Sequence, residues 1–437
     1  MQYPIPKGVF DILPQDPDPD YSWRNSDRWQ YIEKIIRKTC ESYGYKEVRT
    51  PIFERTELFV RGVGESSDIV NKEMYTFLDK ADRSMTLRPE GTASLMRAFV
   101  EKKLYTQPTL HKYFYIGPMF RYERPQAGRY RQHHQFGAEA LGIDKPEQDV
   151  ELIDLATTLY GKLGLSNLKV MINSVGSEET RKKYMAALKA YLEPQFDQLS
   201  DDSKGRFHKN IFRILDSKDK TDQAILNGSP SILDFLSDAD KTHFNKVCCL
   251  LEEIKIDFQI NPKLVRGLDY YNRTVFEITT SDLGAQNSIG GGGRYDGLTE
   301  TVGGPFTPSV GFATGIERVL QTMQSQNVEF PAPPHPFIYL IPMGEAALNF
   351  CFQLTSKLRK YEIGAETDLS HKKIQTSIQM ANSIHADYVI VIGEQEMESN
   401  KATLKHLKTR EIKEISLSQI TEEIQNLHAK EKDDEKR

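Results

Sequence analysis

The run PAPPHP, from Pro331 to Pro336, constrains the fold of this chain more than any other feature. Proline fixes its own backbone angle φ and has no N–H to donate, so such a run cannot continue a helix or a central strand. A chain of 437 residues is also too long for one ordinary core. We therefore expect one domain over residues 1–330, a stiff linker over residues 331–336, and a second domain over residues 337–430.

After the linker, the pattern alternates between strand and helix. The apolar runs FIYLIPM, IGAETDL and DYVIVIG are typical of strands, whereas ALNFCFQLTSKLRKY and KIQTSIQMANSIHA have the spacing of amphipathic helices. This order predicts a small α/β domain with a mostly parallel sheet.

The longer segment before the linker mixes strand and helix patterns. Helical spacing begins near Asp27 and returns over VELIDLATTLYGKL and GFATGIERVLQTMQ. Strands are expected over YKEVRTPIF, SMTLRPE, KYFYIGPMFRYE, LKVMINSVG and RTVFEITTSD. Residues 177 to about 258 have helical periodicity and no catalytic cluster. They predict a helical insertion between two halves of one sheet domain.

Composition excludes several classes of protein. No apolar run approaches the ~18 residues that span a bilayer, and the N-terminus MQYPIPKGVFDILP lacks the features of a secretion signal. We therefore expect a cytoplasmic protein with no membrane partner. The four cysteines show no CxxC or zinc-knuckle spacing, so we expect reduced thiols and no zinc. The net charge of −5 says little about nucleic acid, because a local patch sets the field at a binding surface.

Residues 120–139, FRYERPQAGRYRQHHQFGAE, gather cations and aromatic rings. Guanidinium groups pair with phosphate oxygens and stack on purines. A strand and loop carrying Arg121, Arg124 and Arg129 could therefore grip a nucleoside triphosphate or touch a nucleic-acid backbone. A solvated charged hairpin is the alternative. Metal binding by His133 and His134 is disfavoured, because neighbours on a strand face opposite ways; packing or contact with a base is expected for one of them.

Two further stretches place charged groups beside glycine. In TLRPEGTASLMR, Glu90 ends a short strand, Gly91 permits close approach and Thr92 could N-cap the next helix. A carboxylate there suits an ammonium group, with a surface cap as the alternative. In LVRGLDYYNRTVFEI, Arg266 could neutralise charge that develops on a phosphate. The alternative is a surface arginine beside a core tyrosine pair.

Glycine and arginine also mark the last two stretches. The four glycines 290–293 in SIGGGGRYDGL lack the GK[ST] ending of a P-loop and leave a floor without side chains. This floor suits a flat substrate, or it is a tight bulge with no function. In VGFATGIERVL, Phe312 and Ile316 are expected to lie on the buried face of a helix, leaving Arg318 elsewhere.

The order of these stretches resembles that of class II aminoacyl-tRNA synthetases. FRYE with its arginine-rich loop and GFATGIERVL resemble motifs 2 and 3 of that class, and RTPIFERTELF (Arg49 to Phe59) resembles motif 1, which builds its dimer interface. LVRGLDYY and GGGGRYDGL are similar to the signature stretches of histidyl-tRNA synthetases. The resemblance covers essentially the whole chain. It implies an α+β catalytic domain with a mainly antiparallel sheet flanked by helices, a helical insertion, and a small C-terminal α/β anticodon-binding domain.

The resemblance also implies roles for individual residues. Arg121 and Arg266 would be catalytic, the first holding the ATP α-phosphate and the histidine carboxylate, the second stabilising charge at the α-phosphate. The residues implied to bind ATP are Arg121, Glu123, Arg129 and Arg318. The residues implied to bind histidine are Glu90, Gly91, Thr92, Arg121, Gln135, Glu139, Arg266, Tyr270 and Tyr271.

The hydrogen-bonding properties of imidazole support the implied pocket independently of the family resemblance. A neutral imidazole carries one donor and one acceptor on a flat ring. A carboxylate and a tyrosine hydroxyl would read both nitrogens, and analogues that lack either group would leave buried polar atoms unpaired. Activation of histidine by ATP and transfer to tRNA need positioning and charge stabilisation, which explains the arginines.

The implied partners are ATP with Mg²⁺, L-histidine, tRNA(His) and a second copy of the chain, with no organic cofactor, no zinc and no metal ligand assigned among the side chains. The anticodon-binding contacts are expected from Lys372, Lys373, Lys401, Lys405, Lys408 and Arg410, although solvated lysines are the ordinary interpretation. One rival is a catalytically silent relative that regulates the first enzyme of histidine biosynthesis and lacks the anticodon domain. Another is a related synthetase for threonine, proline or glycine.

Overall fold

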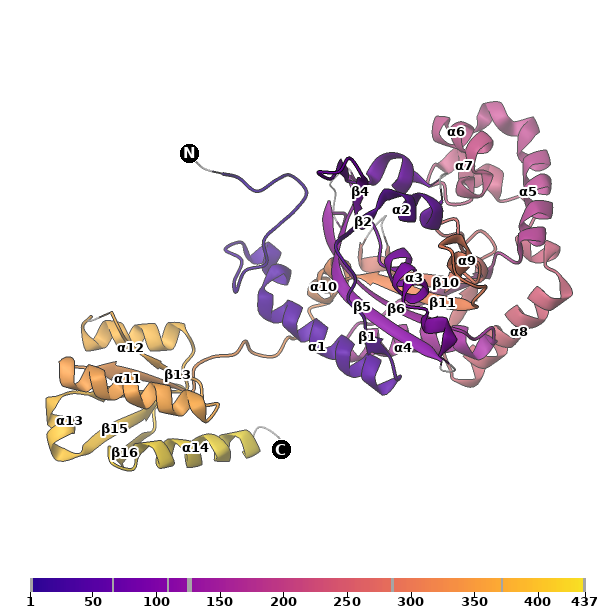
Figure 1. The fold of residues 1–437 in the computed structure, drawn as a ribbon. Helices are drawn as coiled ribbons and strands as arrows, with labels where there is room; N and C mark the ends of the chain where they lie inside the picture. The colour runs from indigo at the N-terminus through magenta and orange to yellow at the C-terminus, as the bar shows by residue number, and fades with distance from the viewer. Residues whose placement is uncertain are drawn as a thin grey trace. The chain divides into compact units, whose positions relative to one another are not determined.

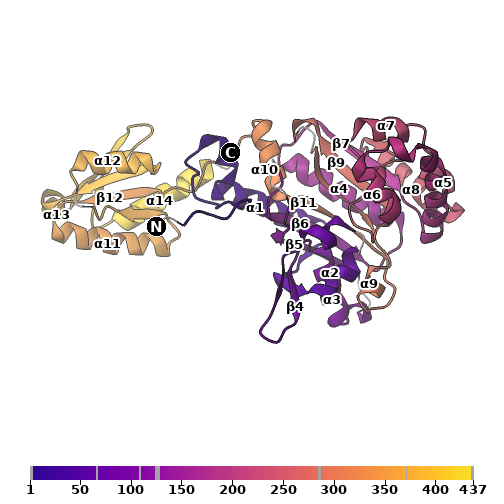
Figure 2. The same ribbon diagram turned by 90° about the horizontal axis from the view of Figure 1, so that it is seen from above.

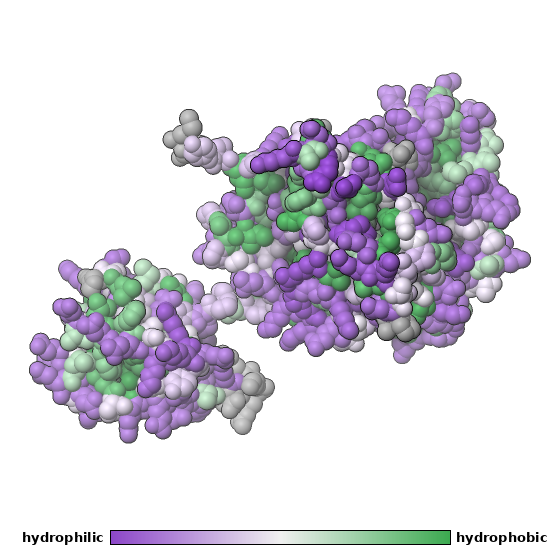
Figure 3. All heavy atoms as spheres, viewed as in Figure 1, coloured by the Kyte–Doolittle hydropathy of each residue, from purple (hydrophilic) through white to green (hydrophobic). Residues whose placement is uncertain are grey.

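The computed structural model describes residues 3–64, 67–107, 110–123, 128–283, 287–370 and 372–434. The chain folds into two compact units, which divide between Phe330 and Pro331 (Figure 1). Residues 331–336 form neither helix nor strand. No helix in the described part of the chain is long and apolar enough to cross a membrane. In the view of Figure 3, hydrophilic side chains cover most of the surface of each unit, with apolar patches between them.

The first unit contains strands, α-helices and shorter helical turns. Its strands are β1 (Lys46–Glu47), β2 (Phe53–Arg55), β3 (Thr76–Leu78), β4 (Ser84–Leu87), β5 (His111–Phe120), β6 (Gln132–Leu141), β7 (Leu168–Ser174), β8 (Phe258–Ile260), β9 (Asn272–Thr280), β10 (Ser288–Arg294) and β11 (Ser309–Gly315). Its α-helices are α1 (Ser26–Ser42), α2 (Thr56–Val63), α3 (Thr92–Glu101), α4 (Pro146–Lys162), α5 (Glu178–Leu192), α6 (Asp201–Lys209), α7 (Lys220–Leu226), α8 (Asp238–Glu253), α9 (Leu298–Thr301) and α10 (Ile316–Ser325). The shorter turns include η1 (Pro19–Arg24), the π-helical η2 (Ile69–Glu73) and η5 (Ile211–Ile214).

An eight-stranded sheet organises this unit, in the order β1-β5-β6-β11-β10-β9-β7-β8. The five pairings between β5 and β7 are antiparallel, whereas the described edge pairings β1–β5 and β7–β8 are parallel. The sheet is therefore mixed, and the expectation of a mainly antiparallel sheet fits its centre but not its edges. A smaller antiparallel sheet has the order β2-β4-β3, and its three strands fall between α1 and α3 in the sequence.

Alternation along β6 explains how one face of the large sheet becomes core and the other becomes a site. Phe136, Ala138 and Ala140 are almost fully buried in the main hydrophobic cluster, together with residues of α1, α4, α8 and α10. Gln135 and Glu139 point to the opposite face, because successive side chains of a strand alternate. The helices thus close one face, and the other face is left for polar side chains.

The strand β11 corrects one sequence-based prediction. We expected GFATGIERVLQTMQ to be helical throughout, but residues 309–315 form β11 and the helix α10 begins only at Ile316. Phe312 therefore belongs to the sheet and not to the helix face. The apolar residues at 312 and 316 fit a helical spacing by coincidence, whereas the small residues Gly311, Ala313 and Gly315 carry the period of two.

Helices α5 to α8 form the segment expected to be an insertion. They gather on one side of the first unit, and Figure 2 shows them next to β7 and β9. Their apolar faces make a separate cluster that includes Tyr184, Leu188 and Ile214, joined to the sheet through Val275 of β9. The helical segment thus packs against β9, the strand that begins directly after Tyr271.

The second unit has its own sheet and core. Its elements are β12 (Ile338–Pro342), α11 (Glu345–Lys360), β13 (Ala365–Thr367), α12 (Ile374–Ser383), β14 (Tyr388–Ile392), α13 (Glu394–Ser399), β15 (Lys401–His406), β16 (Ile412–Ser416) and α14 (Ile420–Asp434). The strand order is β13-β12-β14-β15-β16, parallel through β14 and antiparallel beyond it. The prediction of a mostly parallel sheet missed the β15–β16 hairpin, because its lysines and glutamates alternate with few apolar residues.

Candidate active site

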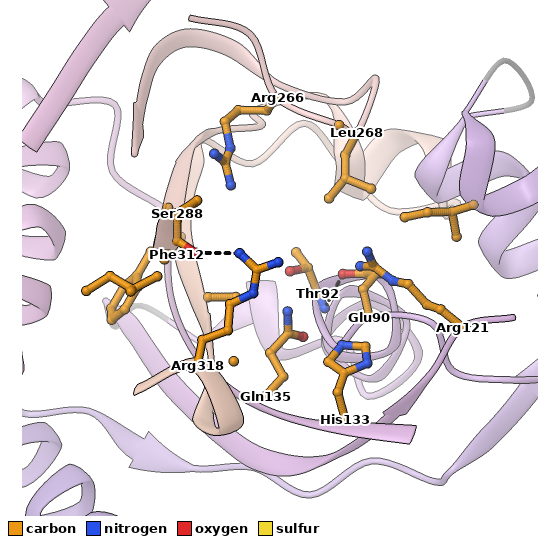
Figure 4. Close-up of a pocket in the computed structure, with 18 of the residues that line it drawn as sticks. Glu90, Thr92, Arg121, His133, Gln135, Arg266, Leu268, Ser288, Phe312 and Arg318 are labelled. Atoms are coloured by element: carbon orange, nitrogen blue, oxygen red, sulfur yellow. Dashed lines mark hydrogen bonds between the residues drawn. The ribbon is translucent and has the colours of Figure 1, made fainter. Parts of the chain in front are cut away.

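A cavity of about 280 Å³ lies on the open face of the large sheet. Arg121, Arg266 and Arg318, which come from three distant parts of the sequence, all line it, and Figure 4 shows their guanidinium groups directed toward one space. The other sequence-predicted residues that line it are Glu90, Thr92, Glu123, Arg129, Gln135, Glu139, Tyr270 and Tyr271. Arg124 lies outside the described residues.

Gly91 is the one predicted site residue that does not line the cavity. It is the N-cap of α3, and a Cβ atom there would meet the ring of Tyr115 at 2.3 Å. Gly91 therefore makes room for Tyr115, whose hydroxyl donates to Gln135 Oε1 at 3.4 Å. Its contribution to the site is indirect.

Backbone carbonyls and carboxylates hold the three arginines in place. Arg121 Nε donates to the Pro89 carbonyl at 2.9 Å, and Arg318 Nη1 donates to the Ser288 carbonyl at 2.6 Å. Arg266 Nη1 donates to Glu277 Oε1 at 2.8 Å. Burial lowers the pKa of Arg318, and the neighbouring arginine charges act in the same direction. Such a cluster of cations favours a ligand with several negative charges.

Glu90 is a buried cap rather than the surface cap considered from sequence. Its two oxygens accept from the backbone N–H of Thr92 at 2.7 Å and of Ala93 at 2.8 Å, so it caps the start of α3. The prediction that Thr92 is the N-cap is therefore wrong. Burial raises the pKa of Glu90, and those hydrogen bonds and the Arg121 charge oppose the rise. The carboxylate sits where an ammonium group would be stabilised.

Glu139 lies deeper in the cavity and is held by hydroxyl groups. Thr92 Oγ1 donates to its Oε1 at 2.7 Å, and the Tyr295 hydroxyl donates to its Oε2. Burial raises its pKa to about 8, although both hydroxyl contacts lower it. A Cβ atom on Gly311, the residue opposite in the ladder, would lie 1.5 Å from Glu139 Oε2. Glycine at 311 therefore makes the space that this carboxylate fills.

The tyrosines form one wall of the cavity. The rings of Tyr270 and Tyr271 have centroids 4.7 Å apart, and Tyr295 packs edge-on against Tyr270 at 5.5 Å. Burial raises the pKa of Tyr271 to about 12, so its hydroxyl keeps its proton near neutral pH. Sequence reasoning missed Tyr115 and Tyr295. Tyr295 lies two residues after the glycine run, beyond Arg294, and that position was the available signal.

The glycine run forms the central strand β10. A Cβ atom on Gly291 would lie 2.7 Å from the Phe276 carbonyl oxygen and 2.9 Å from the Arg266 guanidinium. The strand therefore allows Arg266 to lie directly against the backbone. Of the two interpretations, a floor under the cavity agrees with its position, since Gly290 and Gly291 are lining residues.

The two adjacent histidines have different environments. His133 lines the cavity, where burial, followed by the charge of Arg121, lowers its pKa to about 3. His134 packs edge-on against Trp29, and Glu317 of α10 accepts from its backbone N–H at 2.8 Å. Glu317, which the sequence reasoning also missed, thereby fixes α10 and its Arg318 relative to β6. The described residues contain no group of three or more His, Cys, Asp or Glu side chains suited to a metal ion.

The comparison with known families bears directly on this site. A family model for histidyl-tRNA synthetase matches residues 19–319, well over half of the chain. The chain belongs to the histidyl-tRNA synthetase family. A second model, for an anticodon-binding domain, matches residues 338–427. Histidyl-tRNA synthetase similarity thus covers the unit with the cavity, and the second unit matches an anticodon-binding domain, which was not expected of the regulatory rival.

Individual relatives are similar to this chain over nearly its full length and theirs. The histidine–tRNA ligase of Protochlamydia amoebophila is 54% identical over 98% of this chain and 100% of its own. That of Bacillus licheniformis is 49% identical over 95% of this chain and 97% of its own. The solved structure of S. aureus histidyl-tRNA synthetase without ligand superposes with a TM-score of 0.81 at 37% identity, and covers 97% of this chain and 100% of that one.

Proposed function

We propose that this chain is a histidine–tRNA ligase. It activates L-histidine with ATP to form histidyl-adenylate and pyrophosphate, then transfers the histidyl group to the 3′ end of tRNA(His). One observation carries the proposal: Arg121, Arg266 and Arg318 line a single cavity that also contains Glu139 and a tyrosine wall. The identity to curated ligases over the full length supports the same conclusion.

In this proposal, ATP binds along the arginines. Arg121 holds the α-phosphate together with the histidine carboxylate, and Arg318 holds the γ-phosphate end. Glu123 and Arg129, which pair at 3.0 Å, position the nucleotide. Arg266 stabilises the charge that develops at the α-phosphate when the histidine carboxylate attacks it. Figure 4 shows Arg121, Arg266 and Arg318 around one space, and Glu123 and Arg129 line the same cavity, which supports the assignment.

Histidine binds at the deeper end of the same cavity. Its ammonium group lies near Glu90 and Thr92, and its imidazole lies between Glu139 and the tyrosine wall of Tyr270 and Tyr271. Gln135 completes the polar contacts. A buried carboxylate facing tyrosine hydroxyls can distinguish an imidazole from apolar or purely accepting side chains, because a mismatched substrate leaves one of these groups unpaired.

Mg²⁺ would accompany ATP and is held by phosphates and one or two carboxylates in most such sites. Glu123 and Glu277 both border the arginine-rich mouth of the cleft, and each is paired with an arginine. With only these two carboxylates nearby, the site fits a Mg²⁺ ion bound mainly by the phosphate oxygens of ATP. Mg²⁺ would supply charge neutralisation of the triphosphate.

The second unit is proposed to bind the anticodon end of tRNA(His). Its β15–β16 hairpin carries several lysines, and Lys401 pairs there with Glu414 at 2.7 Å. The match of residues 338–427 to an anticodon-binding domain supports this role. We place the protein in the cytoplasm, where its tRNA substrate is charged.

We further propose that the chain forms a homodimer through its small sheet. Ile52, Phe53, Phe77 and Leu78 are 44% to 64% exposed, and the rings of Phe53 and Phe77 pack edge-on. An exposed apolar cluster of this kind typically marks a protein interface. Leu78→Glu should halve the mass measured by light scattering, whereas Leu369→Glu, at a 61% exposed position of the second unit, should leave it unchanged. A monomeric unmodified protein would refute the dimer.

The activity is tested by exchange of labelled pyrophosphate into ATP, with one amino acid added at a time. Histidine should support exchange, and threonine, proline and glycine should not. Equal exchange with proline or threonine would defeat the assignment of specificity. Failure of exchange with every amino acid, in a folded protein that binds ATP, would favour the regulatory rival.

A further inference from the structure

The loop from Val265 to Tyr271 carries Arg266 and two residues of the tyrosine wall, Tyr270 and Tyr271. This loop is not packed tightly on every side. A second cavity, of about 620 Å³, lies between this loop and the helices α5 and α6. Arg266 and Tyr271 line both cavities. Because no side chains of α5 and α6 fill this space against the loop, polar contacts that cross to the loop help to fix its position.

Two such contacts come from the helical segment. Arg181, in the first turn of α5, donates through Nη1 to the Tyr271 carbonyl oxygen at 2.7 Å. Asn210, between α6 and η5, donates through Nδ2 to Asp269 Oδ1 at 3.0 Å. Both acceptors belong to the loop that forms the wall of the candidate active site, whereas both donors lie outside that site.

Hydrogen bonds hold the start of α5, where Arg181 lies, in a fixed position. The Ser177 side chain caps α5, and Asp240 of α8 accepts from the Ser177 backbone N–H at 3.0 Å. Asp240 also pairs with Arg273 at 3.2 Å, two residues beyond Tyr271. The start of α5 is therefore tied to the start of β9 by a carboxylate. Because the start of α5 is fixed in this way, the Arg181 guanidinium can hold the Tyr271 carbonyl group in one position.

Arg181 is partly buried, and burial lowers its pKa. A desolvated guanidinium is costly unless it is hydrogen-bonded. Glu178 supplies opposite charge, and so does Asp269, which lies in the same loop as Tyr271. The loop and Arg181 thus stabilise each other.

We propose that Arg181 is a positioning residue for histidine binding: through the Tyr271 carbonyl, it holds the loop so that Tyr271 faces the imidazole. The inference rests on the proposed function. It assigns to the helical segment a role in the first half-reaction, in which no tRNA takes part. Arg181 itself does not line the main cavity.

The test measures histidine-dependent pyrophosphate exchange without tRNA, in the full-length chain. Arg181→Ala should raise the KM for histidine about ten-fold or more, because a charged hydrogen-bond donor is lost, while the KM for ATP stays within about two-fold. Arg181→Lys should restore much of the loss, since lysine keeps a charged donor. Lys183→Ala is the matched control, because Lys183 lies on the same helix, is 63% exposed and pairs only with Glu179 among the described ion pairs.

A second variant guards against a folding defect. Asn210→Ala removes the other contact from the helical segment and should also raise the KM for histidine selectively. A histidine KM within two-fold of the unmodified value in both variants would overturn the inference, as would an equal rise in the KM for ATP. If the unmodified chain shows no histidine-dependent exchange, the proposed function itself fails.

Discussion

Two buried carboxylates at the candidate site differ in what surrounds them. Glu90 accepts from two backbone N–H groups at the start of α3, which favour its charged form. Glu139 accepts instead from the hydroxyls of Thr92 and Tyr295. Burial is the largest influence on Glu139 and, together with the charge of Glu90, raises its pKa to about 8. In the ligand-free site, burial thus raises the pKa of both carboxyl groups, and that of Glu139 rises far enough for it to carry a proton near neutral pH.

Glu139 should leave a measurable pH dependence in the stability of the ligand-free protein. Between its ordinary pKa of 4.5 and about 8, the folded chain holds a proton that the unfolded chain has lost. Raising the pH through this window therefore favours unfolding. Relative to Glu139→Gln, which cannot titrate, the unfolding temperature of the unmodified protein should fall from pH 5 to pH 8. Parallel curves for the two proteins would contradict the raised pKa.

Arg266 should contribute to the rate of adenylate formation. Its guanidinium lies against the glycine strand and pairs with Glu277 at 2.8 Å. Arg266→Ala should slow adenylate formation by about 10²-fold or more, the typical effect of losing one charge stabiliser. Lys263→Ala removes a nearby cation that contacts Asn227 and should have little effect. A near-normal single-turnover rate for Arg266→Ala, with the fold intact, would remove the catalytic role.

At the scale of single residues, the sequence indicated chemistry better than geometry. The arginines and Glu139 were predictable because the family resemblance maps them position by position. Tyr115, Tyr295 and Glu317 were not, because strand alternation tells which face a side chain takes but not which strands are neighbours. The non-consecutive order β6-β11-β10 brings Glu139 and Tyr295 together from 156 residues apart.

At the scale of elements, the strand β10 shows why glycine is required between two ladders. A Cβ atom on Gly292 would lie 1.9 Å from the Gly311 carbonyl oxygen and 2.6 Å from Phe312 Cα. Both neighbours are backbone atoms of β11 and cannot move aside without separating the strands. The four glycines therefore serve close strand packing as well as the floor of the cavity.

Gly292→Ala should accordingly destabilise the first unit. Overpacking typically costs about 1–3 kcal/mol, so the unfolding temperature should fall by several degrees, and histidine-dependent exchange should fall with it. Gly297→Ala is the control, because a Cβ atom there meets nothing within 4 Å and its φ is −89°. Equal unfolding temperatures for the two variants would show that β10 and β11 can separate at no cost.

Element type was predicted well where the hydrophobic period was unambiguous. The helices α1, α4 and α11 fall within the segments that were expected to be helical or overlap them closely. The strand β11 was taken for helix because its small residues left the apolar period ambiguous. The π-helical η2, which borders the cavity at Ile69, had no recognisable signal. These failures occur where backbone geometry is set by neighbours distant in sequence.

At the scale of the whole molecule, the chain contains two sets of hydrophobic clusters that share no residue. The clusters of the first unit end at Phe330, and those of the second begin at Phe337. Every residue that lines the main cavity belongs to the first unit. The first unit therefore has its own core and the side chains that are proposed to form the adenylate.

A chain that ends at Pro336 should separate the two half-reactions. It keeps Arg121, Arg266 and Arg318, so histidine-dependent pyrophosphate exchange should remain within about ten-fold of the full-length rate. Charging of tRNA(His) should fall by about two orders of magnitude, because the phosphate contacts proposed for the second unit would be lost. Circular dichroism and the unfolding temperature of the shortened chain provide the folding control. Full charging by this chain would mean that residues 337–430 do something other than bind tRNA, whereas loss of exchange in a folded protein would mean that the second unit supports the first half-reaction.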